Sequence, residues 1–446
     1  MFLLPVQSMS EKFVNNPPIF NQYLENFSKG YDFTIKYAAA MYNASLMAMG
    51  SFVTLPSDTE AKNIRNTVMA SFDSYLRKAL EEESFASSLA DYLDIFVENM
   101  RLTRHNIAHQ MFDSFFSFWN NSLEPFRDSI NRTSSEIIPM EGHFDLLHYK
   151  SEQPIKQKTP LLIVGSLINR YYILDLLPKI SIIKKFQQAG FDVYATDWRT
   201  PKSYDKDMTL DSYARQYLEY AVEKVQEITC SKKISLFGYC WGGIFALIHA
   251  AIHPWHVKNL ILHATPTDLE TEPTSVELWT KKMNADHLVN VFGNIPGSFL
   301  NAAFLMRNPV EAFLKYLRFF GEPRTIDEIE RFFSIEMWLY DSRPIIGEVF
   351  RKIVDDIYNN NLLIKNKMKV GEKLVDLKKI TMPVLNIVGE KDDLVPPQSS
   401  RTINDVIDSK DKKLLEFPTG HVGLCISSTA HERLWPDVVE WLALRS

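Results

Sequence analysis

Hydrophobic positions follow two different patterns along the chain. From about residue 60 to residue 120 they recur every three or four residues, which is the period of a helix with one buried face. This face is rich in aromatic residues, and no glycine occurs between Gly50 and Gly142. We therefore predict a helical N-terminal region over residues 1–135. We expect its apolar stripe to be an ordinary helix-packing face, and a docking face for a partner helix is the alternative.

Beyond residue 135 the pattern changes to short apolar runs bounded by turn residues, with helical stretches between several of them. The runs are Pro160–Gly165, Phe191–Ala195, Ile234–Phe237, Leu260–His263, Val384–Val388 and Lys413–Phe417. Buried parallel strands that alternate with helices predict an α/β domain with a mostly parallel central sheet over residues 136–446. Residues 268–375 interrupt this alternation with long helical pieces and few strand signals. We expect them to form a cap inserted over the active edge of the sheet.

Composition narrows the class of protein. The 446 residues are 46% hydrophobic and 23% charged, with a net charge of −6, which does not indicate nucleic-acid binding. Three cysteines, an odd and small number, argue against a disulfide framework and for a reducing compartment. The apolar start lacks a basic segment before it, and no early run reaches the roughly 20 apolar residues of a membrane span. We expect a cytoplasmic protein without a transmembrane segment.

The stretch FGYCWGG (237–243) has the form of a nucleophile elbow, a sharp turn that joins a buried strand to a helix. Gly238 and Gly242 leave room for the close approach of strand and helix. The central residue is Cys240 where most elbows carry serine, and the start of a helix favours its thiolate. We predict an α/β-hydrolase fold with Cys240 as the nucleophile. A buried structural cysteine in a glycine-rich turn is the alternative.

An elbow of this type requires an acid and a histidine further along the chain. Asp392 follows the strand predicted to end at Val388, and His421 lies in a glycine-flanked loop before the last helix. We predict these two residues as the acid and the base. The oxyanion hole is expected to use the backbone N–H of Trp241 and one amide of the loop after the first parallel strand. The sequence does not determine which amide of that loop points inward, and our candidate is Ile168.

Other reactive residues have simpler explanations. His249, His253 and His256 recur at near-helical spacing, but they follow the elbow helix and are more typical of packing than of a metal site. Cys425, one turn past His421, fits packing better than a second nucleophile, and Lys391 fits an exposed position. We predict no metal and no bound cofactor.

Several motifs, taken in order, resemble polyhydroxyalkanoate synthases, in particular the catalytic subunit of the two-subunit class III type. The matching stretches include INRYYILDL (168–176), DVYATDW (192–198), FGYCWGG (237–243), ATPTDLE (264–270), EMWLYDS (336–342), MPVLNIVGEKDDLVPP (382–397) and FPTGHVGLCIS (417–427). The resemblance extends from about residue 135 to the end. The sequence departs from the family at Asp393, where histidine is common, and at the bulky Trp241.

The resemblance implies an acyltransferase that polymerises (R)-3-hydroxyacyl-coenzyme A into polyhydroxyalkanoate and releases coenzyme A. It assigns the acyl-accepting thiol to Cys240 and the supporting acid and base to Asp392 and His421. The coenzyme A thioester is then the substrate, and the implied partners are the polyester granule surface, a second copy and a second synthase subunit. Two alternatives remain: a thioesterase or ester hydrolase with the same triad, and a non-catalytic granule-associated protein.

Overall fold

The structure is a computed structural model that describes residues 133–446, apart from 152, 206–207, 273, 275, 277–279, 282, 308–314 and 316–324. The chain divides into two compact units, one of Met1–Gln110 with Leu278–Val291 and one of Met111–Glu277 with Phe292–Ser446. The second unit contains the sheet and is described below. Nearly all of the predicted helical region 1–135 lies outside the described residues, so that region and its boundary stay predictions.

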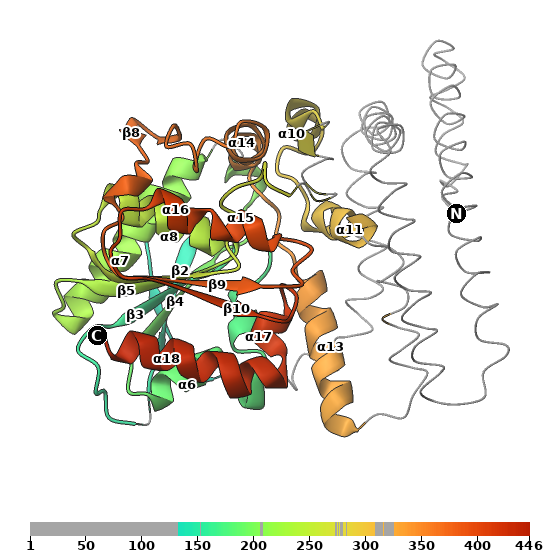
Figure 1. Cartoon of the computed structure of the whole chain (residues 1–446). Coiled ribbons are helices and arrows are strands. Elements are labelled where there is room, and N and C mark those ends of the chain that lie inside the picture. Colours follow the sequence, from blue (N-terminus) through green and yellow to red (C-terminus); the bar gives the residue numbers. More distant parts are fainter. Residues whose placement is uncertain are drawn as a thin grey trace, which may run out of the picture. The chain divides into compact units, whose positions relative to one another are not determined.

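An eight-stranded sheet has the order β1-β2-β4-β3-β5-β6-β9-β10, and Figure 1 shows it between two layers of helices. The strands are β1 (Glu136–Pro139), β2 (Phe144–Tyr149), β3 (Leu161–Val164), β4 (Val193–Trp198), β5 (Ile234–Tyr239), β6 (Val257–His263), β9 (Val384–Gly389) and β10 (Lys412–Phe417). The pairs from β4 to β10 are all parallel, whereas β1–β2 and β2–β4 are antiparallel. Each predicted apolar run is a strand of this sheet, and the predicted fold class is confirmed.

The central strands are buried on both faces, which explains their continuous apolar sequences. Every residue of β3, β5 and β9 is buried. The β1–β2 pair was not predicted, because β1 is mostly exposed at the edge of the sheet and lacks an apolar run. It turns through Gly142, whose φ of +98° favours glycine.

Helices cover both faces of the sheet (Figure 1). One face carries α6 (Ile182–Gln188), α17 (Gly423–Ile426) and α18 (Trp435–Ala443), and the other carries α7 (Leu218–Thr229), α8 (Trp241–Ile252), α15 (Pro397–Arg401) and α16 (Ile403–Val406). A π-helix, Ser212–Tyr217, leads directly into α7.

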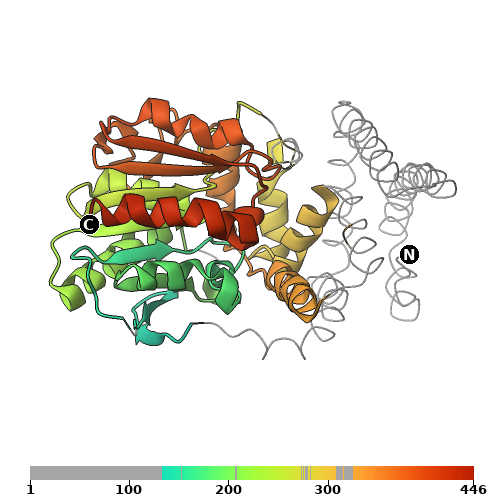
Figure 2. The same ribbon diagram turned by 60° about the horizontal axis from the view of Figure 1, so that its bottom comes forward.

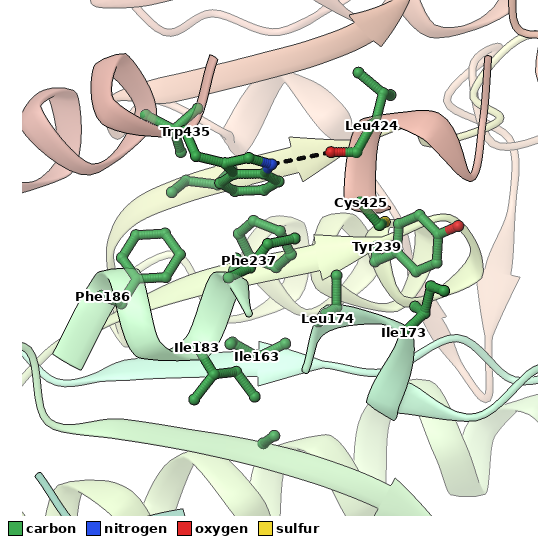
Figure 3. Close-up of a cluster of buried hydrophobic side chains, with 14 of the residues drawn as sticks. Ile163, Ile173, Leu174, Ile183, Phe186, Phe237, Tyr239, Leu424, Cys425 and Trp435 are labelled. Carbon is green, nitrogen blue, oxygen red and sulfur yellow. Dashed lines mark hydrogen bonds between the residues drawn. The ribbon is translucent and has the colours of Figure 1, made fainter. Parts of the chain in front are cut away.

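Aromatic side chains join the first of these helical layers to the sheet (Figure 3). The ring centroid of Trp435 lies 6.4 Å from that of Phe186 on α6 and 6.0 Å from that of Phe237 on β5. The indole N–H of Trp435 donates a 2.9 Å hydrogen bond to the carbonyl oxygen of Leu424. This contact ties α18 to α17, the short helix that follows the loop bearing His421.

The described residues between β6 and β9 are mainly helical, in keeping with the sequence pattern. They include α11 (Gly297–Arg307), α13 (Ile326–Tyr340), α14 (Gly347–Lys352), the π-helix Ile353–Asn359 and the short hairpin of β7 (Lys369–Val370) and β8 (Lys373–Leu374). Helix α10 (Ala285–Phe292) belongs almost wholly to the first unit. Figures 1 and 2 both place α11 and α13 beyond the carboxyl ends of the parallel strands. Of the helices in the described part of the chain, none combines the length and apolarity needed to cross a bilayer.

Candidate active site

Cys240 lies at the turn between β5 and α8 with φ 53° and ψ −118°, a backbone conformation that non-glycine residues rarely adopt. Its N–H donates to the carbonyl oxygen of His263 at 2.8 Å, and its carbonyl oxygen accepts from the N–H of Gly243 at 2.9 Å. Strain of this kind costs about 1–3 kcal/mol and is typical of functional positions. The turn leaves the thiol half-buried at the carboxyl edge of the sheet.

Two glycines make this turn possible. A Cβ atom on Gly238 would lie 2.4 Å from the Cα atom of Gly243, and one on Gly242 would lie 2.0 Å from the carbonyl oxygen of Val164. Both contacts are to backbone, which cannot move aside as a flexible side chain would. The approach of α8 to β3 and β5 therefore requires glycine at both positions.

Asp392 and His421 come from the loops that follow the neighbouring parallel strands β9 and β10. These loops are joined by a hydrogen bond from the N–H of Lys391 to the carbonyl oxygen of Thr419, at 3.1 Å. The Oδ2 atom of Asp392 lies 2.7 Å from Nδ1 of His421, and the two side chains are 1% and 6% exposed. The other carboxylate oxygen accepts the backbone N–H groups of Leu394 at 3.0 Å and Val395 at 2.8 Å. The carboxylate is thus fully hydrogen-bonded and faces the imidazole.

The charge state of His421 connects it to Cys240. Burial lowers the pKa of His421, but the charges of Asp392 and Cys240, together with hydrogen bonds to both, raise that pKa to about 10. Because Nδ1 faces the carboxylate, Nε2 is the nitrogen available to the thiol. The carboxylate thus stabilises the imidazolium that forms when His421 accepts a proton. The structure therefore brings together the three residues predicted as nucleophile, acid and base, and their roles stay predictions.

The predicted oxyanion donors lie at the same edge. Trp241 is the first residue of α8, where a backbone N–H has no partner within its own helix. In the loop after β3, the N–H of Gly165 donates to Oγ1 of Thr196 at 3.1 Å, so Gly165 is not the donor. The carbonyl oxygen of Ile168 accepts the N–H of Arg343 at 3.0 Å. The choice of Ile168 as the second donor stays a prediction.

Comparisons with known proteins identify the family to which this chain belongs. Residues 159–425 match the family model for the alpha/beta hydrolase fold, and residues 74–186 match that for the N-terminus of poly-beta-hydroxybutyrate polymerase (PhaC). Relatives named poly(3-hydroxyalkanoate) polymerase subunit PhaC share 38% identity in Haloferax mediterranei, 37% in Allochromatium vinosum and 36% in Thiocystis violacea. The matches cover 71%, 65% and 70% of this chain and 65%, 82% and 88% of those relatives.

The chain belongs to the PhaC polymerase family. The family resemblance drawn from the motifs is thereby confirmed, and the chain is an acyltransferase.

Within the described part of the chain, the other reactive residues singled out from the sequence do not form a second site. The rings of His249, His253 and His256 stack, with centroids 5.1–5.8 Å apart, so they present faces rather than converging nitrogens. Across the described residues, no group of three or more His, Cys, Asp or Glu side chains could hold a metal ion. Cys425 is fully buried, which raises the pKa of its thiol, and Lys391 is exposed.

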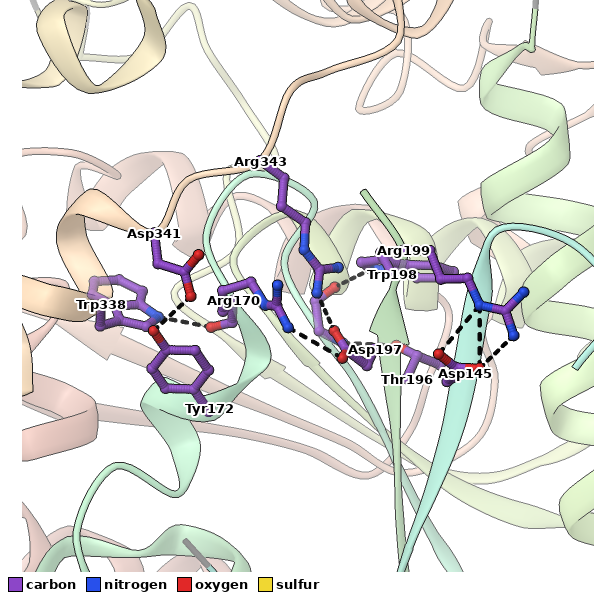
Figure 4. Close-up of polar contacts among 11 residues, drawn as sticks. Asp145, Arg170, Tyr172, Thr196, Asp197, Trp198, Arg199, Trp338, Asp341 and Arg343 are labelled. Carbon is purple, nitrogen blue, oxygen red and sulfur yellow. Dashed lines mark hydrogen bonds and ion pairs between the residues drawn. The ribbon is translucent and has the colours of Figure 1, made fainter. Parts of the chain in front are cut away.

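A network of charged residues at the active edge escaped the sequence analysis (Figure 4). The carboxylate of Asp197, at the end of β4, pairs with the guanidinium groups of Arg170 and Arg343. The only local signal was an aspartate near the end of a buried strand. Arg343 is 146 residues away from Asp197 in sequence, so no periodic pattern could reveal the pair.

Proposed function

We propose that this PhaC family member polymerises (R)-3-hydroxyacyl-coenzyme A and that Cys240 carries the acyl chain as a thioester. The observation that carries the proposal is the buried Asp392–His421 pair beside a cysteine at a strained elbow. Exchange of a thiol with a thioester is nearly thermoneutral, so the enzyme-bound acyl group stays reactive toward an alcohol. An ester on serine would be a weaker acyl donor. This difference accounts for cysteine at the elbow.

In the first step, Nε2 of His421 takes the proton of the Cys240 thiol, and the sulfur attacks the carbonyl carbon of the substrate thioester. The N–H of Trp241 and one amide of the loop after β3 stabilise the resulting oxyanion, each by about 3 kcal/mol. The adduct then breaks its bond to the sulfur of coenzyme A. That thiolate leaves with the proton from His421, and the acyl group remains on Cys240.

In the second step, the 3-hydroxyl of one acyl unit attacks the thioester of another, forming an ester and releasing a thiolate. Either Asp392 or His421 could activate that hydroxyl. Both carboxylate oxygens of Asp392 are already hydrogen-bonded, and its side chain is 1% exposed. These contacts support His421 as the base, with Asp392 holding the imidazole in place.

The partners in this proposal follow the family resemblance. The coenzyme A thioester is the substrate, and no other cofactor is needed. We propose that the enzyme acts at the surface of the polyester granule as a homodimer, with a second synthase subunit as a further candidate partner. The residues before 133, outside the described part of the chain, are the candidate contact region.

Purified protein supplied with 3-hydroxybutyryl-coenzyme A tests the function. We expect release of coenzyme A with formation of polymer, and a loss of about 10³-fold or more in Cys240→Ala. Cys230→Ala is a matched control, because Cys230 is exposed and has the same φ of 53°. Free 3-hydroxybutyrate without polymer would show a hydrolase instead. Unchanged release in Cys240→Ala would support a non-catalytic protein.

A further inference from the structure

The loop that follows β3 is held by a distant segment of the cap. We name residues Gly165–Arg170 the oxyanion loop and residues Trp338–Arg343, at the end of α13 and just beyond it, the cap strap. Three consecutive residues of the loop bind the strap. The contacts are Arg343 N–H to the Ile168 carbonyl oxygen at 3.0 Å, Asn169 Nδ2 to Ser342 Oγ at 3.0 Å, and Trp338 Nε1 to the Arg170 carbonyl oxygen at 2.7 Å.

The first residue of the oxyanion loop is held by β4. The N–H of Gly165 donates to Oγ1 of Thr196 at 3.1 Å, and its carbonyl oxygen accepts the indole N–H of Trp198 at 2.9 Å. Ser166 and Leu167 therefore lie between two anchors, one on β4 and one on the cap strap. Both anchors therefore constrain the loop.

Asp197 connects the two anchors. It lies on β4 between Thr196 and Trp198, and its carboxylate pairs with Nη2 of Arg343 and, at 3.4 Å, with Nη2 of Arg170 (Figure 4). The side chain of Arg343 is only 6% exposed. Burial lowers the pKa of Arg343, and the charge of Asp197 opposes that effect. A buried guanidinium needs a counter-ion, so this pair draws the cap strap onto β4.

We propose that the cap strap sets the position of the oxyanion loop and that Arg343, acting through Asp197, is a positioning residue for acyl transfer to Cys240. The inference rests on the proposed function. An oxyanion donor stabilises the transition state only at about 2.7–3.1 Å from the developing charge, and loss of one donor lowers kcat by about 10²- to 10³-fold. A displaced loop should therefore lower kcat and leave KM nearly unchanged.

Two reactions of the Cys240 thiol distinguish a positioning role of Arg343 from general damage to the active site. Acylation by 3-hydroxybutyryl-coenzyme A passes through an oxyanion. Alkylation by iodoacetamide requires the thiolate but forms no oxyanion. For Arg343→Gln we expect single-turnover acylation to fall about 10- to 100-fold, with KM and the alkylation rate of Cys240 each within about 2-fold of the unmodified chain. Alkylation is followed at the Cys240 peptide by mass spectrometry, which keeps Cys230 and Cys425 apart.

Two further variants complete the test. Arg331→Gln is the matched control, because Arg331 lies on α13 and its Nη1 donates to an exposed serine hydroxyl, that of Ser428, at 3.3 Å. It should change neither rate. Arg343→Lys keeps the charge and should recover part of the acylation rate. If Arg343→Gln does not fold, the test uses Arg343→Lys alone. Wild-type acylation in both Arg343 variants, or an equal fall in acylation and alkylation, would overturn the proposal. Absence of acylation in the unmodified chain would instead overturn the proposed function.

Discussion

Asp392→Asn is the sharpest test of how the acid supports the base. The substitution keeps the size of the side chain and removes one charge. The Oδ1 position must still accept the backbone N–H groups of Leu394 and Val395, so the amide oxygen of the new asparagine takes that place. Its NH₂ group then faces Nδ1 of His421, where the carboxylate lay at 2.7 Å. An NH₂ group can only donate, and Nδ1 must become the acceptor.

The imidazole proton then moves to Nε2, the nitrogen that should take the proton of Cys240. His421 is left in the wrong tautomer, and its pKa falls because it loses the charge and hydrogen bond of Asp392 that helped to raise that pKa to about 10, while burial still lowers it. The equivalent change in a serine triad costs about 10⁴-fold in kcat. A thiol ionises partly without help, so we expect acylation to fall about 10³-fold.

The assay follows both acylation and alkylation of Cys240 from about pH 5 to about pH 10. In the unmodified chain, the raised pKa of His421 favours the imidazolium through neutral pH, so we expect alkylation of Cys240 to be fast there. In Asp392→Asn, alkylation should be slow at neutral pH and rise as pH increases, as for an ordinary thiol. Asp393→Asn is the matched control, since that carboxylate pairs with Arg307 at 2.8 Å and is 46% exposed. If Asp393→Asn loses acylation and Asp392→Asn keeps it within about 3-fold, the acid has been assigned to the wrong residue.

Two further substitutions test the elbow and the pH dependence of stability. Gly242→Ala places a methyl group 2.0 Å from the carbonyl oxygen of Val164, so we expect a loss of about 3 kcal/mol in the free energy of unfolding, measured with urea, together with loss of acylation. An unchanged urea midpoint would show that the helix does not approach β3 as closely as described. Burial and the charge of His421 lower the pKa of His263 to about 3, so the unfolded chain binds a proton there below about pH 6.5 and the folded chain does not. Stability should therefore fall by up to about 1.4 kcal/mol per pH unit from this residue as pH drops from 6.5 toward 4, and His263→Phe should remove that slope. An equal slope in the variant would contradict the assignment.

The proximity of Asp392 and His421 could be predicted from the sequence, because the loops that follow neighbouring parallel strands lie at the same edge of the sheet. Gly389 at the end of β9 pairs with Phe417 at the end of β10. Asp392 and His421 follow these two residues after three and four positions, so neighbouring strands in register bring them together. The strands themselves were recognisable because β3, β5 and β9 are buried along their whole length and read as continuous apolar runs. The antiparallel pair β1–β2 has no such run, because β1 is mostly exposed at the edge of the sheet, and it could not be predicted in this way.

The contact between the cap strap and the oxyanion loop lay beyond the sequence for a physical reason. Apolar periodicity reports which face of an element is buried, but an arginine that is 6% exposed has the same local pattern as an exposed one. Arg343 is buried only because the chain returns from α13 to the end of β4. Asp197 did carry a usable signal, since a carboxylate beside the carboxyl end of a buried strand needs a cation or hydrogen-bond donors. The existence of a partner therefore followed from the position of Asp197, whereas the identity of that partner depended on how the chain folds back after α13.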